Sequence, residues 1–210
     1  MLSDEQRSHW DLKYEQGLPS LEKPDPFYLS SFDQFVADSF PNGGTALDLA
    51  GGIGRHALWL AKRNWRVTVV DISGVAIRKL DQKARQLGLE LDLSALDAKE
   101  YLFKPAYFDL IVMFYHFDRD ICPKVLSTLK TGGILICKSS VSWDSNKGAA
   151  PASIRPLARS EILSIFPGLW VMHHQERPVR DHGVVEYVGK KPGFREITTP
   201  NTIDVVRNPR

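Results

Sequence analysis

Strand-like apolar runs alternate with runs of helical spacing over the first two thirds of the chain. The expected strands are residues 45–50, 66–71, 91–96, 107–115 and 134–139. The expected helices between them are residues 54–64, 73–87 and 119–130. An alternation of this kind forms a parallel sheet, because each right-handed crossover places a helix between two successive strands. We therefore predict an α/β fold with a Rossmann-like sheet and helices on both faces.

The last third of the chain has a different pattern. A short helix is expected at 158–166, and two strand-like runs follow at 169–176 and 183–190. A turn from Pro178 to His182 separates these two runs, which is typical of an antiparallel pair. We predict that this C-terminal hairpin closes one edge of a seven-stranded, mostly parallel sheet.

Length and composition fit one globular domain. The chain has 210 residues, and we expect a single domain over residues 1–190. The tail, 191–210, has three prolines and little periodicity, so we expect it to be extended or disordered. No apolar run approaches the ~20 residues that cross a membrane, and the polar N-terminus lacks the apolar core of a secretory signal.

Charge and cysteine content limit the possible partners. The formal net charge is only +2, which argues against a dedicated nucleic-acid binder. Only Cys122 and Cys137 are present, so a reducing, cytoplasmic location without disulfides is expected. No Cys/His cluster has the spacing of metal ligands, and we predict no metal site. The sequence leaves the oligomeric state open.

The run LDLAGGIGR, residues 47–55, places three glycines directly behind the first expected strand. Its G-x-G-x-x-A spacing fits a loop that cradles a dinucleotide pyrophosphate, but alone this pattern is weak. The same loop could admit the amino-acid end of S-adenosylmethionine. Asp48 favours the second ligand, because a carboxylate repels a pyrophosphate and attracts an α-ammonium group. An NAD(P)-dependent oxidoreductase is the alternative.

Polar and aromatic residues end the next three strands. In an open parallel sheet, ligands bind beyond the carboxyl ends of the strands. Asp71 ends the second strand and can accept two ribose hydroxyls, and Asp97 follows the third strand, where it can accept a hydrogen from an adenine amine. Asp97 can equally act as the N-cap of a helix at 98–103. The fourth strand ends in Phe114, Tyr115 and His116.

These motifs together resemble the class I S-adenosylmethionine-dependent methyltransferases. DLAGGIG resembles their first motif, VVDIS their second and ALDA their third, while FDLIVMFYHF and LKTGGILI resemble their fourth and fifth strands. One departure is Ala50, which stands where a glycine is usual. The resemblance implies S-adenosylmethionine as cofactor. The cofactor contacts expected within these motifs are Asp48, Ala50, Gly51, Gly52, Gly54, Arg55, Asp71, Ile72, Asp97, Ala98 and Phe114.

The N-terminal segment narrows the resemblance. HWDLKY at residues 9–14 and KPDPFY at residues 23–28 look like the lead-in of the tellurite-resistance and thiopurine-methyltransferase-like group, and DHGVVE at 181–186 resembles its final hairpin. In such enzymes the N-terminal segment folds over the cofactor. Residues 1–40 are therefore expected to form a helical lid, with Trp10 and Tyr14 against the cofactor.

The expected reaction is methyl transfer to a small molecule. Such a transfer needs alignment and exclusion of water more than acid–base chemistry. Phe114 and Tyr115 would face the methyl group, and His116 and His182 are candidate bases. Arg55 could contact the cofactor carboxylate, bind an anionic substrate, or neutralise a neighbouring aspartate.

The end of the fourth strand bears on the acceptor. It reads Phe-Tyr-His-Phe in place of the Asn/Asp-Pro-Pro-Tyr/Phe run of enzymes that methylate nucleic-acid bases. We therefore expect a small-molecule acceptor with an oxygen, sulfur or other chalcogen atom, and neither a nucleic acid nor a membrane as partner. A cofactor-binding module without catalysis is a further alternative.

Overall fold

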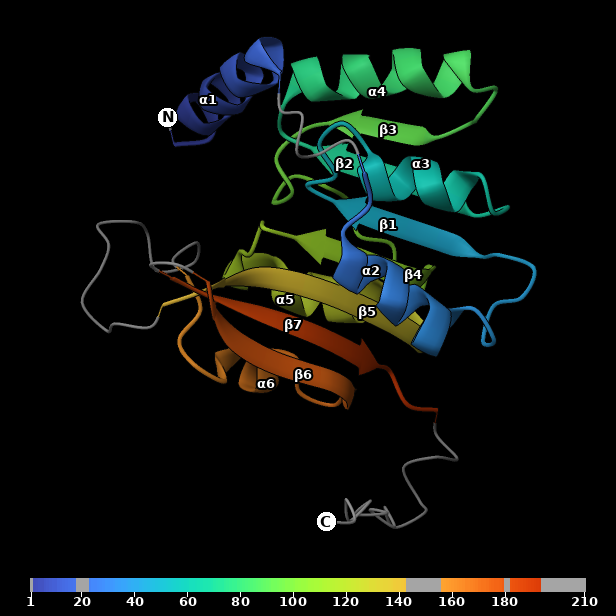
Figure 1. Ribbon diagram of the computed structural model, residues 1–210, viewed down its shortest axis with the longest axis vertical. Coiled ribbons are helices and arrows are strands. Elements are labelled where there is room, and N and C mark those ends of the chain that lie inside the picture. The colour runs from blue at the N-terminus through green and yellow to red at the C-terminus, as the bar shows by residue number, and fades with distance from the viewer. Residues whose placement is uncertain (1, 18–22, 143–155, 180–181, 194–210) are drawn as a thin grey trace.

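The computed structural model describes residues 2–17, 23–142, 156–179 and 182–193 (Figure 1). Its strands are β1 (Thr45–Leu49), β2 (Arg66–Asp71), β3 (Asp92–Ala95), β4 (Phe108–Phe114), β5 (Leu129–Val141), β6 (Trp170–Val179) and β7 (His182–Lys190). Its helices are α1 (Leu2–Gln16), α2 (Pro26–Ser31), α3 (Arg55–Ala61), α4 (Gly74–Gln86), α5 (Cys122–Thr128) and α6 (Glu161–Ile165), with a π-helical turn at Phe32–Val36 and a 3-10 turn at Arg119–Ile121.

All seven strands form one sheet in the order β3-β2-β1-β4-β5-β7-β6. Strands β1 to β5 are parallel, whereas β7 is antiparallel to both β5 and β6. The predicted mostly parallel sheet with an antiparallel C-terminal hairpin is thus confirmed. Both hairpin strands are longer than expected, and Pro178 lies inside β6 rather than in the turn. The tail beyond residue 193 lies outside the described residues.

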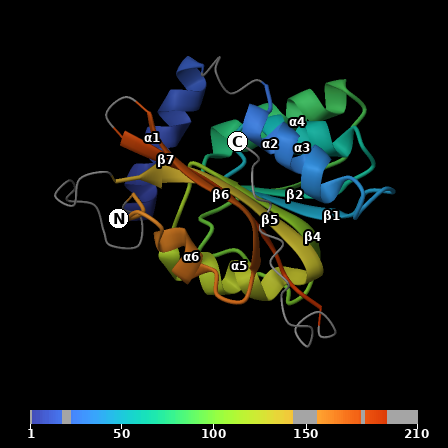
Figure 2. The same ribbon diagram turned by 60° about the horizontal axis from the view of Figure 1, so that its bottom comes forward.

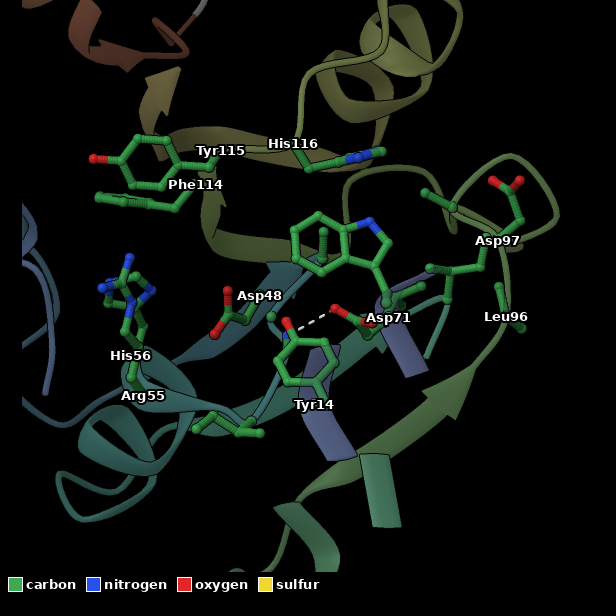
Figure 3. Close-up of a pocket in the computed structure, with 18 of the residues that line it drawn as sticks. Tyr14, Asp48, Arg55, His56, Asp71, Leu96, Asp97, Phe114, Tyr115 and His116 are labelled. Carbon is green, nitrogen blue, oxygen red and sulfur yellow. Dashed lines mark hydrogen bonds between the residues drawn. The ribbon is translucent and has the colours of Figure 1, made fainter. Parts of the chain in front are cut away.

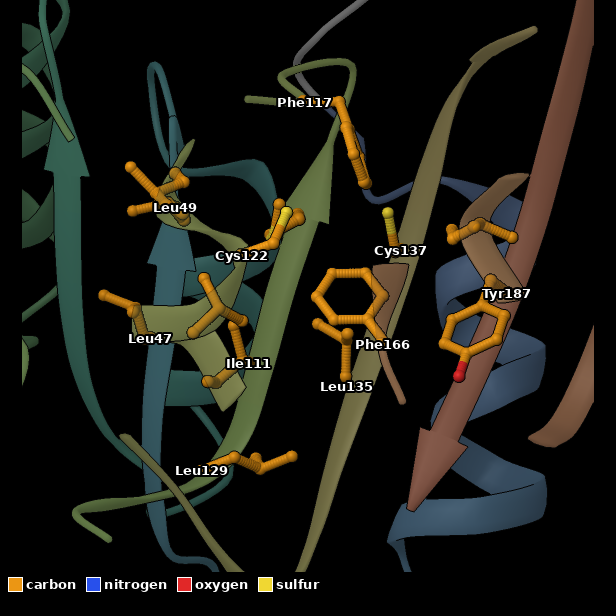
Figure 4. Packing of buried hydrophobic residues seen from close by; sticks show 14 of the residues in the cluster. Leu47, Leu49, Ile111, Phe117, Cys122, Leu129, Leu135, Cys137, Phe166 and Tyr187 are labelled. Carbon is orange, nitrogen blue, oxygen red and sulfur yellow. The ribbon is translucent and has the colours of Figure 1, made fainter. Parts of the chain in front are cut away.

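Helices cover both faces of the sheet, as Figure 2 shows for α2, α3 and α4 above it and α5 and α6 below it. Alternate residues of each strand supply the two cores. On β1, Leu47 and Leu49 pack with α5 and α6, and Figure 4 shows them in this cluster with Ile111 and Leu135. Ala46 packs on the opposite face with α2, α3 and α4. Asp48 shares that second face, and this parity aims its carboxylate away from the α5 side.

Local signals set the bounds of α4. The Ser73 hydroxyl accepts a hydrogen bond from the Ala76 N–H, so Ser73 is the N-cap. Gly88, just past the last turn, has a left-handed φ of +65°. The expected range 73–87 therefore differs from the observed helix by one residue at each end.

The expected helix at 119–130 is wrong in its last two residues. Helix α5 ends at Thr128, and residues from Leu129 onward belong to β5, which runs through Gly132 and Gly133. Lys130 forms an ion pair with Asp109 of β4, with Nζ 2.9 Å from Oδ2. Pairing with β4 therefore overrides the helical propensity of this stretch.

A second expected helix, at 98–103, is also absent from the described residues. Residues 98–100 form a turn instead. The Asp97 carboxylate caps this turn by accepting a hydrogen bond from the Lys99 N–H at 2.9 Å. A helix therefore does not begin at Asp97, although the predicted capping by its side chain is real.

The N-terminal segment is helical, as predicted, and docks in two places. Helix α1 packs on the start of α4, where the Asp11 carboxylate accepts hydrogen bonds from the Ser73 hydroxyl and from the Val75 N–H. Helix α2 packs beside α3 on the sheet face that carries Asp48 (Figure 1). In the described part of the chain no helix is long and apolar enough to span a membrane.

Candidate active site

A pocket of about 150 Å³ lies beyond the carboxyl ends of β1, β2, β3 and β4, under helix α1 (Figure 3). Fourteen of the predicted site residues line it: Trp10, Tyr14, Asp48, Ala50, Gly51, Gly52, Arg55, Asp71, Ile72, Asp97, Ala98, Phe114, Tyr115 and His116. The structure thus brings together residues that are spread over more than a hundred positions of the sequence.

Two predicted site residues are not part of this lining. Gly54 begins α3 with a φ of +74°, and a side chain there would overlap Leu80 of α4. Its glycine is therefore required by helix packing rather than by the pocket. His182 is the first residue of β7, opposite Val179, and its side chain is not described. The predicted role of His182 as a base therefore lies outside what the structure describes and stays a prediction.

The loop after β1 turns sharply at two left-handed residues. Ala50 has a φ of +55° and Gly52 a φ of +56°. Only Gly adopts this conformation without a steric cost, which is about 1–2 kcal/mol for other residues. Gly52 has a second constraint, because a Cβ there would overlap the hydroxyl of Tyr14. The loop therefore contains one strained residue, at the position where a glycine is usual.

Replacing Ala50 by glycine is expected to raise the free energy of unfolding by up to about 1 kcal/mol, because relief of the left-handed strain exceeds the extra chain entropy of Gly. Chemical denaturation measures this change. Ala57→Gly in α3 is the control, since glycine inside a helix destabilises by about 1 kcal/mol. If Ala50→Gly destabilises as much as the control does, the strain at Ala50 is absent.

Asp48 is the most unusual side chain of the pocket. Only 1% of its surface is exposed, and its Oδ2 atom has no hydrogen-bond partner among the described residues. Burial raises the pKa of Asp48 to about 7, although the Ala57 N–H and the Arg55 guanidinium act in the opposite direction. An unpaired buried carboxylate is costly, which points to a cationic ligand group that completes its environment.

Asp71 is buried, and each of its two carboxylate oxygens accepts a hydrogen bond from the backbone. Its Oδ2 accepts a hydrogen bond from the Gly52 N–H at 2.8 Å, and its Oδ1 accepts one from the Ser73 N–H at 2.9 Å. Burial raises the pKa of Asp71, and these two N–H groups lower it. Asp71 therefore fixes the glycine loop against the start of α4. Each carboxylate oxygen retains a lone pair for a ligand.

Helix α1 covers the pocket through Tyr14 and Trp10. Tyr14 is 7% exposed, and its hydroxyl lies against Gly52. Trp10 packs on Tyr14 with ring centroids 5.9 Å apart and remains 36% exposed. The Lys79 ammonium donates a hydrogen bond to the Tyr14 carbonyl at 2.5 Å. Contacts to the glycine loop and to α4 thus hold α1 in this position.

Asp48 lies between two groups of pocket residues. Figure 3 shows Arg55 and His56 on one side of Asp48, with Phe114 beside them, and His116 and Asp97 on the other side. Burial lowers the pKa of His116, and its Nε2 has no partner among the described residues. His116 therefore belongs to the side where an adenine was predicted, rather than beside Arg55.

Five lining residues were not predicted from the sequence: Gln6, Ile53, His56, Val70 and Leu96. Three of them are apolar neighbours of predicted residues, and their position follows once the strands are placed. Gln6 lies on α1, four residues before Trp10 and so on the same helix face. His56 follows Arg55 directly, and no sequence pattern distinguishes it from a surface histidine.

In a comparison with known protein families, one family matches part of the chain. Residues 46–133, from β1 into β5, match the family described as methyltransferase domain. This range contains the glycine loop, Asp71, Asp97 and the end of β4. No curated protein shows significant sequence similarity to the chain.

Many solved structures share the fold. The [4+2]-cyclase SpnF matches with a TM-score of 0.65 and 19% identity, over 79% of this chain and 80% of SpnF. A S-adenosylmethionine-dependent methyltransferase from Methanosarcina mazei matches with a TM-score of 0.61 and 18% identity, over 81% of this chain and 99% of that one. TehB from Haemophilus influenzae matches with a TM-score of 0.60 and 18% identity, over 70% of this chain and 57% of TehB. At these identities the matches establish the fold.

Proposed function

We propose that this chain, a class I S-adenosylmethionine-dependent methyltransferase that resembles the TehB-like group, transfers its methyl group to an oxygen, sulfur or other chalcogen atom of a small molecule. The enzyme class and the cofactor follow from the methyltransferase-domain match together with the fold. The acceptor class and the role of each residue are our proposal. The observation that supports it best is the unpartnered Oδ2 of Asp48 inside a glycine-lined pocket.

The residues of the pocket fit S-adenosylmethionine from end to end. Asp48 would accept hydrogen bonds from the α-ammonium group, and the bare backbone of Gly51 and Gly52 leaves room for the amino-acid part. Arg55 forms no ion pair with a carboxylate among the described residues, but its positive charge lowers the pKa of Asp48 and so partly offsets that carboxylate. The guanidinium also remains available to the carboxylate of the methionine part or to the acceptor.

The other side of the pocket suits the nucleoside. Asp71 would accept hydrogen bonds from the ribose hydroxyls and Asp97 from the adenine amine, and the Ala98 backbone would lie beside the adenine ring. Ile72 supplies an apolar wall next to Asp71. Because His116 lies on this side, we propose that it contacts the nucleoside and do not retain it as the base.

Methyl transfer requires little from the protein beyond holding the cofactor and the acceptor in line. When bound, the cofactor supplies a methyl group that its sulfonium charge already activates for in-line displacement. Helix α1 excludes water through Trp10 and Tyr14, and the lid role predicted for residues 1–40 remains our proposal. Phe114 and Tyr115 would stabilise positive charge with their ring faces, worth about 0.5–2 kcal/mol. Tyr115 is suited to meet the acceptor, because it is 51% exposed and its backbone is left-handed, with a φ of +59°.

Binding and turnover measurements test this function separately. Titration with S-adenosylhomocysteine is expected to stabilise the protein against heat, whereas NADH is expected to have no effect, because only a ligand of the native state raises stability. A screen of thiols, phenols and oxyanions with labelled S-adenosylmethionine is then expected to yield a methylated product, with Asp48→Asn as the inactive control. Stabilisation by NADH alone would favour the oxidoreductase alternative, and binding without any product would favour the non-catalytic module.

A further inference from the structure

His56 lies in the pocket wall and packs closely against two aromatic rings. Its side chain is 2% exposed, and its ring centroid lies 4.5 Å from that of Tyr28 and 4.5 Å from that of Phe114. It nevertheless lines the pocket beside Arg55 (Figure 3). A histidine held so tightly presents one fixed edge to a ligand.

A hydrogen bond determines which ring nitrogen carries the proton. The backbone N–H of Asp25 donates to Nε2 of His56 at 3.3 Å. Nε2 is therefore unprotonated, and the proton of the neutral ring resides on Nδ1. The Nδ1–H group makes no hydrogen bond to the described residues.

Buried ion pairs fix the peptide that makes this bond. The Asp25 carboxylate accepts hydrogen bonds from the Lys138 ammonium at 3.0 and 3.1 Å and from the Phe27 N–H at 2.9 Å. Lys138 also forms an ion pair with Glu186, at 2.9 Å. All three charged side chains are less than a tenth exposed. Asp25 therefore cannot turn its N–H away from His56 without breaking this network.

Burial and the surrounding charges keep His56 neutral. Burial lowers the pKa of His56 to about 2, and the positive charges of Arg55 and Lys138 act in the same direction. The carboxylates of Asp25 and Glu186 offset the charge of Lys138, because each forms an ion pair with its ammonium group. Asp48, the other carboxylate lining this part of the pocket, is about half ionised near pH 7 in the ligand-free protein, and its charge would be paired with the α-ammonium group once the cofactor is bound. His56 can thus donate a hydrogen bond but cannot take a proton from an acceptor.

We propose that His56 is a specificity-determining residue whose Nδ1–H binds the methyl acceptor as an oxygen or sulfur anion, such as a phenolate or a thiolate. The proposal rests on the proposed methyltransferase function and adds the ionisation state of its acceptor. A fixed donor beside an unpaired guanidinium stabilises an anion more than its neutral acid. The acceptor then reaches the site already deprotonated, which removes the need for a general base.

A chromogenic phenol tests the proposal without turnover. 4-Nitrophenol ionises near neutral pH, and only its phenolate absorbs visible light, so absorbance reports the ionisation of the bound probe. In protein saturated with S-adenosylhomocysteine, the pKa of bound 4-nitrophenol is expected to fall by about one unit or more. His56→Phe is expected to remove this shift, and His56→Gln, which keeps a donor, to retain part of it. An unchanged or raised probe pKa, no binding of the probe, or the same shift in His56→Phe would overturn the proposal.

Two further measurements separate the possible failures. Binding of S-adenosylhomocysteine is expected to persist in His56→Phe, because the proposed contact of His56 is to the acceptor. No binding even to the original protein would mean that the proposed function itself has failed. Nitrogen NMR of the histidine-labelled original protein is independent of any variant. It is expected to show a protonated Nδ1 and an unprotonated Nε2 for His56 from about pH 5 to pH 9. A protonated Nε2 would contradict the proposal.

Discussion

Gly52→Ala is expected to weaken binding of S-adenosylhomocysteine by at least about tenfold. The new Cβ would overlap the Tyr14 hydroxyl, which lies 7% exposed against the loop, so α1 has to shift away from the pocket. The left-handed φ of +56° adds a strain of about 1–2 kcal/mol. Each 1.4 kcal/mol corresponds to a factor of about ten in affinity. Isothermal titration calorimetry measures the loss.

Two variants separate the overlap from the strain. Tyr14→Phe removes the overlapping hydroxyl, so the double variant with Gly52→Ala is expected to recover part of the lost affinity. Gly88→Ala carries the same kind of strain, with a φ of +65°, but no atom lies within 4 Å of its new Cβ. It is expected to lower stability without changing affinity. If Tyr14→Phe gives no recovery, α1 does not cover the loop through Tyr14.

Cofactor affinity is expected to fall by up to about tenfold per pH unit below about pH 7, and to be nearly constant just above it. The cause is Asp48, whose pKa burial raises to about 7 in the ligand-free protein. Only its ionised form attracts an ammonium group, so binding below that pH must first release a proton. Calorimetric titrations of S-adenosylhomocysteine at several pH values, in buffers of different ionisation enthalpy, measure both the slope and the released proton.

Asp48→Asn is the matched variant. It is expected to weaken cofactor binding but to raise the stability of the ligand-free protein. It is expected to bind weakly at every pH and to abolish the slope. The raised pKa of Asp48 means that this residue favours the folded state at low pH and that the benefit is lost as the pH rises from about 4 to about 7. The ligand-free variant is therefore expected to be more stable than the original protein at neutral pH. A slope that persists in Asp48→Asn would assign it to another group, such as Asp71.

Regular local patterns made most of the fold predictable. Ser73 and Gly88 indicate the ends of α4 within one residue, because caps depend on neighbours in the sequence. The expected helix at 119–130 extended two residues too far, because the Lys130 side chain pairs with Asp109, 21 positions away. Local propensity carries no information about such a partner.

The candidate site also contains residues that the sequence places correctly and residues whose position depends on tertiary packing. Asp48, Gly52 and Asp71 lie at strand ends, and parallel strands bring their carboxyl ends to one edge of the sheet, so the glycine loop and its carboxylates follow from order along the chain. Gly54 has the same motif spacing but meets Leu80, which only the packing of α3 on α4 reveals. His116 was expected only as a candidate base, and the path of the chain after β4 places it on the same side of Asp48 as Asp97.

The sequence by itself determined the sheet, the glycine loop and the acidic residues at its edge, because each depends on alternation or on spacing within one βα unit. Only the tertiary structure decided that the Asp48 carboxylate has an unpartnered oxygen and that His56 is a neutral donor. Both properties arise from burial and from partners far along the chain, such as Lys138, which lies 113 positions from Asp25. Charge state depends on which groups exclude water and which supply hydrogen bonds, and those groups are set by the folded packing.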